Sequence, residues 1–239
     1  MNIFVKGDAM ADLEHLWPGG PVLYQAEHFR LGTDCVLLAG FANTSGAALL
    51  LLLLRTNTLH MTGLEIVPEA AELARKNLTA NGLAERGEIV IGDIREHRSL
   101  FSAGSFDLVI ANPPYFPAGS GAFPPDPDRA AARGEFLCTL DDICTAAGFL
   151  LHTGGRVCLV HRPERLSELF CSLSFRGLEP KRLRLVCKRP ELAPTLVLVE
   201  ARRGGKPGLV IEPPLVLQDP DGRESEMLAA FYGRCSGQP

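Results

Sequence analysis

Residues 106–115 read Phe-Asp-Leu-Val-Ile-Ala-Asn-Pro-Pro-Tyr, and this stretch decides the fold class of the chain. The apolar run over residues 106–111 is typical of a buried strand in a parallel sheet. The Asn-Pro-Pro-Tyr loop therefore follows the carboxyl end of a strand, which is where open α/β sheets bind their ligands. We expect a ligand site at residues 112–115.

The four residues of this loop suit methyl transfer to a planar amino group. Such a nitrogen is a poor nucleophile, and two acceptors aimed at its hydrogens favour the tetrahedral geometry that attack requires. The Asn112 side-chain oxygen and the Pro113 carbonyl can be those acceptors. Pro114 holds Pro113 extended, and Tyr115 offers a flat face for a flipped base. The alternative is a proline-rich turn that only ends the strand, with Tyr115 packed against the protein.

Strands and helices alternate along the chain around this loop. Apolar runs and helix signals predict strands at residues 59–67, 88–91, 106–111, 156–161, 181–187 and 195–201, and helices at 31–42, 69–81, 140–151, 163–175 and 224–232. Residues 46–54 fit either a helix or a strand, and the first twenty residues show no regular pattern. The alternation predicts an α/β fold with a mostly parallel sheet, helices on both faces and a terminal antiparallel strand pair.

The composition indicates an ordinary globular protein. The 239 residues suit one domain, with an N-terminal extension (1–30), a catalytic core (31–210) and a C-terminal tail (211–239). The net charge of −4 excludes an overall basic nucleic-acid binder, so any RNA surface has to be a local patch. No signal peptide is recognised, and the apolar run at 47–54 is too short to cross a membrane.

The seven cysteines show no CxxC pair and no Cys/His cluster at metal spacing. Several lie inside apolar runs, so we expect buried, reduced thiols and no metal site. Such thiols are typical of a cytoplasmic protein.

Two acidic residues end predicted strands and could hold a nucleoside cofactor. Glu65 can accept hydrogen bonds from both ribose hydroxyls. Asp93 can accept a bond from an adenine amino group, while Ile94 packs on the ring. The alternatives are a favourable helix N-terminal charge for Glu65 and a turn role for Asp93. Because Glu65, Asp93 and Asn112 end three consecutive strands, we expect them to line one crevice.

Several segments give the chain a resemblance to a known family. They are Phe-Arg-Leu-Gly-Thr-Asp at 29–34, Thr-Gly-Leu-Glu-Ile at 62–66, Pro-Glu-Ala-Ala-Glu-Leu-Ala at 68–74, Asn-Pro-Pro-Tyr at 112–115, Gly-Ser-Gly at 119–121, His-Arg-Pro-Glu-Arg-Leu at 161–166 and Glu-Ala-Arg-Arg-Gly-Gly-Lys-Pro-Gly at 200–208. With them the chain resembles the class I S-adenosylmethionine-dependent methyltransferases, and among these the bacterial tRNA-valine adenine-N6 methyltransferase family.

The resemblance implies a Rossmann-like fold, S-adenosylmethionine as cofactor and, as methyl acceptor, the adenosine just after the anticodon of a valine tRNA. It implies catalytic roles for Asn112, Pro113, Pro114 and Tyr115. It implies cofactor-binding roles for Gly46, Glu65, Ile66, Asp93, Ile94 and Asn112.

The chain departs from the family at the first strand. In the family this strand ends in an acidic residue and a glycine-rich loop, which lets the backbone approach the methionine part of the cofactor. Here only Ser45 and Gly46 are similar to that loop. The stretch is about ten residues shorter than a strand and loop need, so a truncation of both stays open.

Three functions therefore stay open. The first is methylation of the adenine amino group in tRNA, and the second is methylation of a protein glutamine, whose amide nitrogen suits the same loop. The third is a relative that binds RNA without the cofactor. For any single basic residue a solvated surface charge is the favoured interpretation. The candidate contacts for tRNA phosphates are Arg129, Arg133, Lys181, Arg182, Arg184, Lys188, Arg189, Arg202, Arg203 and Lys206.

Overall fold

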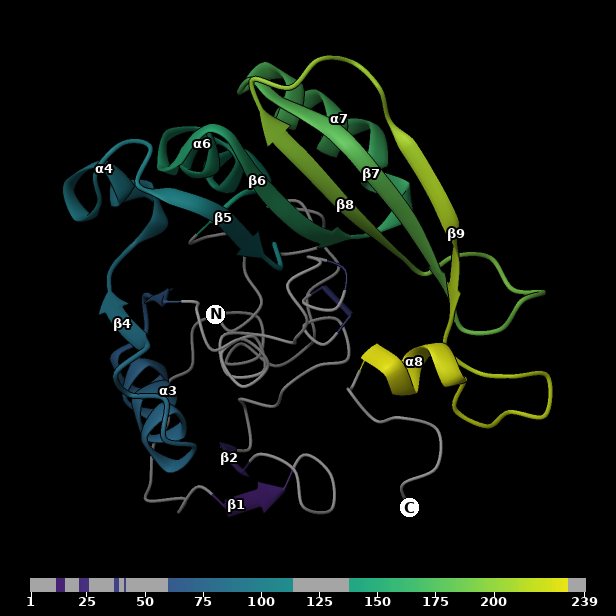
Figure 1. The fold of residues 1–239 in the computed structure, drawn as a ribbon, viewed down its shortest axis with the longest axis horizontal. Helices are drawn as coiled ribbons and strands as arrows, with labels where there is room; N and C mark the ends of the chain where they lie inside the picture. The colour runs from purple at the N-terminus through teal and green to yellow at the C-terminus, as the bar shows by residue number, and fades with distance from the viewer. Residues whose placement is uncertain are drawn as a thin grey trace, which may run out of the picture.

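The computed structural model describes residues 12–15, 22–25, 37–38, 41, 60–113 and 138–231. Figure 1 shows how the elements formed by these residues are arranged. Their bounds are β1 Asp12–His15, β2 Val22–Gln25, β3 Met61–Glu65, α3 Pro68–Ala80, β4 Gly87–Ile91, η1 Ile94–Glu96, α4 His97–Leu100, β5 Phe106–Ala111, α6 Leu140–Leu150, β6 Leu151–His161, η2 Pro163–Arg165, α7 Leu166–Phe175, β7 Leu178–Cys187, β8 Leu196–Arg203, β9 Val210–Val216 and α8 Glu226–Phe231.

The largest sheet has five strands in the order β5-β6-β8-β7-β9. β5 and β6 are parallel, whereas β8 runs antiparallel to both of its neighbours. The antiparallel pair β7–β8 confirms the predicted strand pair at the end of the alternating pattern. The fold is therefore α/β with a mixed sheet, as expected from the sequence.

Alternate residues of the central strands enter separate cores on the two faces of this sheet. Val157 and Leu159 pack with buried residues of α6 and α7, and these helices lie together over one face (Figure 1). Cys158 and Val160 pack on the other face with Phe41 and other buried side chains. Because side chains alternate along a strand, continuous apolar runs such as residues 157–160 are the pattern of strands buried on both faces.

β3 and β4 form a separate parallel pair with α3 packed beside it. Within the described residues this pair shares no ladder with β5. Its link to the five-stranded sheet runs through η1 and α4, both of which contact α6. Pro68 occupies the first turn of α3, as the sequence predicts, because proline has no N–H to leave unsatisfied there.

The N-terminal hairpin corrects one expectation, since residues 12–15 form β1 rather than an irregular segment. β1 pairs antiparallel with β2. The side-chain amides of Asn77 in α3 and of Asn81, the C-cap residue of α3, then bind the backbone of β2. The Val22 N–H donates to Asn81 Oδ1 (3.0 Å) and the Tyr24 N–H donates to Asn77 Oδ1 (2.6 Å). These amides satisfy backbone groups that a further strand would otherwise bind.

β9 is an element that the sequence analysis did not assign. It pairs parallel with β7 at the edge of the sheet, and it contains Pro213 and Pro214. Proline lacks an N–H and is tolerated in sheets only at edges and bulges, so the two prolines concealed this strand.

Other expectations fall outside the described residues. They concern the run 46–54, Gly46, the loop from Pro114 onward, Arg129 and Arg133. Of the predicted helix 31–42, residues 37, 38 and 41 are described, and they are helical. Among the described residues, no helix is both long and apolar enough to cross a membrane.

Candidate active site

The carboxyl ends of β3 and β4 are joined by backbone hydrogen bonds. Glu65 pairs with Ile91 in the ladder, and the Gly92 N–H donates to the Glu65 carbonyl (3.0 Å). The Glu65 side chain is half-buried, and its Oε1 accepts a bond from the Val67 N–H (3.0 Å) at the start of α3. Glu65 thus binds the N-terminus of α3, as the alternative interpretation proposed. Its second oxygen, Oε2, accepts no hydrogen bond within the described residues.

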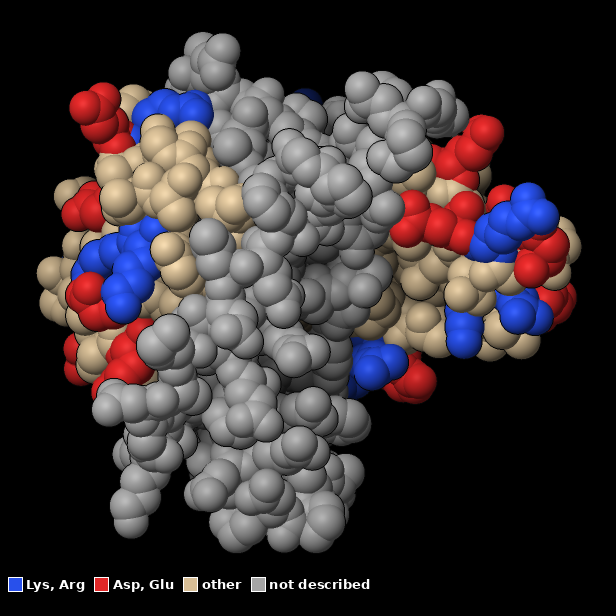
Figure 2. Space-filling model, turned by 90° about the horizontal axis from the view of Figure 1, so that it is seen from below, with Lys and Arg blue, Asp and Glu red and all other residues tan. Residues whose placement is uncertain are grey.

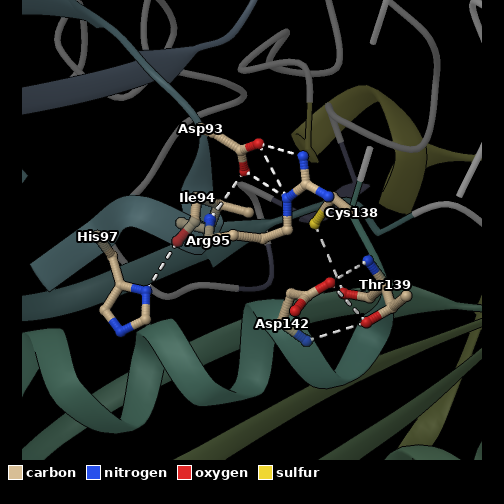
Figure 3. Close-up of polar contacts among 7 residues, drawn as sticks. All are labelled: Asp93, Ile94, Arg95, His97, Cys138, Thr139 and Asp142. Carbon is tan, nitrogen blue, oxygen red and sulfur yellow. Dashed lines mark hydrogen bonds and ion pairs between the residues drawn. The ribbon is translucent and has the colours of Figure 1, made fainter. Parts of the chain in front are cut away.

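Asp93 caps the turn η1 and is held by an arginine that the sequence analysis did not single out. Its Oδ1 accepts the backbone N–H of Arg95 (2.9 Å), and both carboxylate oxygens accept Nε of the same arginine (3.0 and 2.9 Å). Arg95 Nη2 also contacts Oδ2. Figure 3 shows this guanidinium lying against the carboxylate. The side-chain hydrogen bond from Arg95 lowers the pKa of Asp93 below its usual value.

This ion pair occupies the carboxylate that the sequence predicts as the acceptor for adenine. The Asp93 side chain is only 16% exposed, whereas that of Arg95 is 48% exposed. An adenine amino group therefore has to share or displace a bond from Arg95. The sequence did contain a signal for this ion pair. An arginine two residues after a strand-end aspartate is close enough for its side chain to fold back onto the carboxylate.

Gly92 lies close to the Leu100 side chain. A Cβ atom at position 92 would lie 2.7 Å from Leu100 Cδ1, so a larger residue would require that side chain to move. The neighbouring Ile66 and Ile94 are half-buried, so part of each apolar side chain is exposed beside the two carboxylates. Two acceptor carboxylates next to apolar side chains are chemically suited to a nucleoside.

Asn112 and Pro113 follow β5 as predicted. The Asn112 side chain is exposed, whereas Pro113 is buried. β5 pairs with β6, so Asn112 belongs to the large sheet while Glu65 and Asp93 belong to the β3–β4 pair. The structure thus joins the strand ends of Glu65 and Asp93 directly. A single crevice that also includes Asn112 stays a prediction.

The N-terminus of α6 lies beside the Asp93 turn (Figure 3). Thr139 and Asp142 form a capping box there: the Asp142 N–H donates to Thr139 Oγ1 (3.1 Å) and the Thr139 N–H donates to Asp142 Oδ2 (2.8 Å). This box fixes the first turn of the helix against η1.

The described cysteines are free thiols, and Cys144, Cys158 and Cys187 are buried as expected. Cys171 is exposed, contrary to expectation. Burial raises the pKa of Cys138 to about 11, so its thiol stays protonated at neutral pH. Among the described residues no group of three or more metal-ligating side chains is found.

Several of the predicted tRNA-contacting residues turn out to be bonded within the protein. Arg182 binds Glu212 (2.7 Å) and Glu200 (3.0 Å), and Arg184 lies 3.9 Å from Glu212. These two arginines are committed to ion pairs because β9 brings Glu212 beside β7. Lys181 donates to a backbone carbonyl (2.9 Å), and so does Arg203.

The remaining described candidates are Lys188, Arg189, Arg202 and Lys206. In Figure 2 the Lys and Arg side chains visible beside the grey atoms are interspersed with Asp and Glu. That view shows no continuous basic face.

Comparison with known proteins adds a family to this geometry. The tRNA1(Val) (adenine(37)-N6)-methyltransferase of Porphyromonas gingivalis is 34% identical over 191 aligned positions, which cover 72% of this chain and 74% of the relative. The enzyme of the same name from Tolumonas auensis is 30% identical over 225 positions, covering 87% and 91%. This chain belongs to that family of methyltransferases. The family model of the methyltransferase small domain matches residues 41–123, which include Glu65, Asp93 and Asn112.

The fold agrees with this membership. A predicted O-methyltransferase from Agrobacterium tumefaciens superposes with a TM-score of 0.67 at 19% identity, covering 86% of this chain and 97% of that one. A similarity at this identity concerns the fold alone, which is the Rossmann-like methyltransferase fold. Methyltransferases of this kind typically use S-adenosylmethionine.

Proposed function

We propose that this methyltransferase transfers a methyl group from S-adenosylmethionine to the exocyclic amino group of an adenine in tRNA, next to the anticodon. The observation that carries the proposal is the 34% identity to a tRNA1(Val) (adenine(37)-N6)-methyltransferase over 72% of the chain. The position of Asn112 and Pro113 directly after β5 supports it, because that is where the methyl acceptor has to lie. A tRNA substrate also implies a cytoplasmic protein.

In this proposal the chain's own residues orient the acceptor. The Asn112 side-chain oxygen and the Pro113 carbonyl accept the two amino hydrogens, and Tyr115 stacks on the flipped base. Pro114 restricts Pro113 to an extended conformation and so fixes the direction in which its carbonyl points. The bound cofactor supplies an electrophilic methyl group. The nitrogen–methyl bond would form as the sulfur–methyl bond of the cofactor breaks, which leaves S-adenosylhomocysteine. The methylated nitrogen then loses its extra proton to solvent water, so no strong base is needed at Asn112.

The strand-end residues would hold the nucleoside part of the cofactor. Glu65 has one carboxylate oxygen available for ribose hydroxyls, and Asp93 offers an ionised carboxylate because its pKa is lowered. Ile66 and Ile94 would pack against the adenine. The methionine part would lie near Gly46, which is outside the described residues.

The tRNA backbone would be bound by the basic candidates whose side chains form neither an ion pair nor a hydrogen bond within the described residues. Among the described candidates these are Lys188, Arg189, Arg202 and Lys206, and Arg129 and Arg133 belong to the same proposal. Each phosphate contact makes binding weaker as salt concentration rises.

A second candidate is a relative that binds RNA without the cofactor. The ion pair between Arg95 and Asp93 favours it, because this pair occupies the predicted adenine acceptor. Calorimetry with S-adenosylhomocysteine separates the two candidates. Binding in the micromolar range supports methyl transfer, whereas no binding at about millimolar ligand supports the second candidate.

The acceptor is tested next. Purified chain and labelled S-adenosylmethionine are incubated with an unmodified valine tRNA transcript or with a release-factor protein, the latter as a glutamine acceptor. We expect label in the tRNA, recovered as N6-methyladenosine. Label in the protein alone would contradict the proposed substrate.

A further inference from the structure

A pocket lined by three arginines lies beside the amino-terminal ends of β5 and β6, at the opposite end of these strands from the proposed methyl-transfer site. Its volume is about 240 Å³, and it is lined by Arg98, Thr145, Gly148, Phe149, Arg176 and Arg203. Two contacts fix this location: Arg202 pairs with Arg156 of β6, and the next residue, Arg203, donates to the carbonyl of Leu151, the first residue of β6. The pocket is therefore distinct from the proposed methyl-transfer site.

Two of the three guanidinium groups have no carboxylate partner among the residues that the structure describes. Arg98 stacks over the Phe149 ring, with Cζ 4.6 Å from the ring centroid. Arg203 donates to the Leu151 carbonyl. Arg176 does pair with Asp141 (2.6 Å), yet its buried Nε has no hydrogen-bond partner within the described residues. The described part of the chain thus leaves Arg98 and Arg203 in this pocket without a neutralising carboxylate.

The α6 C-terminus offsets only part of this charge. The macrodipole places roughly half a negative charge at a helix C-terminus. Backbone N–H groups already satisfy carbonyls there, since Gly104 donates to Phe149 (2.9 Å) and Leu151 donates to Ala147. Arg203 serves one further carbonyl. Arg98 is held on the face of Phe149 and bonds none of them within the described residues.

We propose that this pocket binds a phosphate group. Planar guanidinium forks match the geometry of phosphate oxygens, and stacking on an aromatic ring keeps such a fork in place. Gly148 supports the arrangement, because a Cβ atom there would lie 3.1 Å from the Arg176 carbonyl and would push α6 away from the end of α7. The phosphate comes either from an RNA backbone or from a free phosphate. Binding of an RNA phosphate rests on the proposed function, whereas binding of a free phosphate does not.

The test uses the full chain and two probes. Inorganic phosphate is titrated by calorimetry at constant ionic strength against a chloride reference, and an unmodified valine tRNA transcript is titrated over a range of salt concentrations. The variants are Arg98→Gln and Arg203→Gln. The control is Arg223→Gln, which removes a guanidinium that is 84% exposed and does not line the pocket. Circular dichroism checks that each variant folds. If Arg203→Gln does not fold, the result for Arg98→Gln decides the test.

We expect the pocket variants to weaken binding of at least one probe about tenfold, as loss of one charged hydrogen-bonding partner predicts. For tRNA, the slope of log affinity against log salt falls by about one. Weaker phosphate binding alone identifies a free phosphate, and weaker tRNA binding alone identifies the RNA backbone. Pocket variants that match Arg223→Gln with both probes overturn the proposal. The phosphate titration still tests the pocket if the tRNA is not a substrate, so failure of the proposed function and failure of this proposal can be told apart.

Discussion

Asn112 is the side chain on which the proposed reaction depends most directly. Replacing it with alanine removes one of the two acceptors for the amino hydrogens. We expect Asn112→Ala to lower kcat about a hundredfold to a thousandfold, as loss of one oriented hydrogen-bonding group in an active site typically does. Cofactor affinity, measured by calorimetry with S-adenosylhomocysteine, stays within a factor of about two because the proposed nucleoside contacts lie at and just after the ends of β3 and β4. Normal turnover in this variant would show that the loop has another role.

Arg95 competes with the cofactor for Asp93 in the proposed site. Removing the guanidinium frees the carboxylate, and an ion pair whose arginine is half-exposed to solvent is worth about 1 kcal/mol. We therefore expect Arg95→Ala to bind S-adenosylhomocysteine about two- to fivefold more tightly, again by calorimetry.

The chain offers a matched control for this change. Arg223 pairs with Asp221 at the same two-residue spacing (3.0 Å) but lies away from β3 and β4. Arg223→Ala should leave the affinity unchanged. Weaker binding in Arg95→Ala would mean that Arg95 contributes to the cofactor site rather than competing with it.

His161 gives the folded chain a pH dependence. It is fully buried at the end of β6, and burial lowers its pKa to about 4 from 6.5. The unfolded chain therefore binds a proton at this histidine at higher pH than the folded chain does. The fold has its full stability above the unfolded pKa of about 6.5, and it loses stability as pH falls from there towards 4. His161 alone then reduces the free energy of unfolding by roughly 2 kcal/mol between pH 7 and pH 5.

Urea denaturation of the wild type and of His161→Gln at these two pH values measures the effect. The glutamine side chain keeps an acceptor for the Arg162 N–H, which donates to His161 Nδ1 (2.8 Å). We expect the variant to lose most of the difference between the two pH values. An unchanged difference would assign the pH dependence to other groups.

At the scale of elements, the capping box of α6 positions the first helical turn against η1. Thr139→Ala removes the acceptor for the Asp142 N–H and should lower the free energy of unfolding by about 1 kcal/mol. Thr139→Ser keeps the oxygen and should restore most of this loss. Urea denaturation compares the three proteins. Equal losses in the serine and alanine variants would mean that the threonine methyl group, not the cap, is important.

Element prediction succeeded where the signal was local. β5 has the predicted bounds, and α3 begins at Pro68 as the turn chemistry requires. β6 begins at Leu151, five residues before its predicted start, because its early residues include two glycines that weaken the strand pattern. β9 was missed because its partner β7 is distant in sequence, and Pro213 and Pro214 are unfavourable in any strand except one at an edge.

At the scale of the whole molecule, Glu200 connects segments that are far apart in the chain. It is 5% exposed, and its Oε2 accepts from Arg182 (3.0 Å) and lies 3.5 Å from Arg156. Arg182 in turn donates to the Phe41 carbonyl (3.3 Å) and stacks on the Phe41 ring at 4.5 Å. The ion pair therefore ties the N-terminal segment to the sheet.

Glu200→Ala removes the buried carboxylate shared by Arg156 and Arg182, while Arg182 keeps its ion pair with Glu212. We expect a loss of about 2 kcal/mol in the free energy of unfolding, as when a hydrogen bond to a charged group is removed. The exposed Glu191→Ala serves as the control and should change stability by less than about 0.5 kcal/mol. Denaturant unfolding measures both. Similar values for the two variants would contradict a structural role for Glu200.

The sequence by itself determined the alternation of strands and helices, and it placed Glu65, Asp93 and Asn112 at strand ends. These features depend on residue type and spacing within a few positions, which a single sequence shows. The tertiary structure alone decided which charged groups are paired. Arg182 and Arg184 were candidates for tRNA contacts, but β9 brings Glu212 to them from about thirty residues away. Likewise Arg98, Arg176 and Arg203 form one pocket only because α4, the end of α7 and the end of β8 meet beside α6. A charge's partner depends on distances in space, and these are set by packing rather than by sequence spacing.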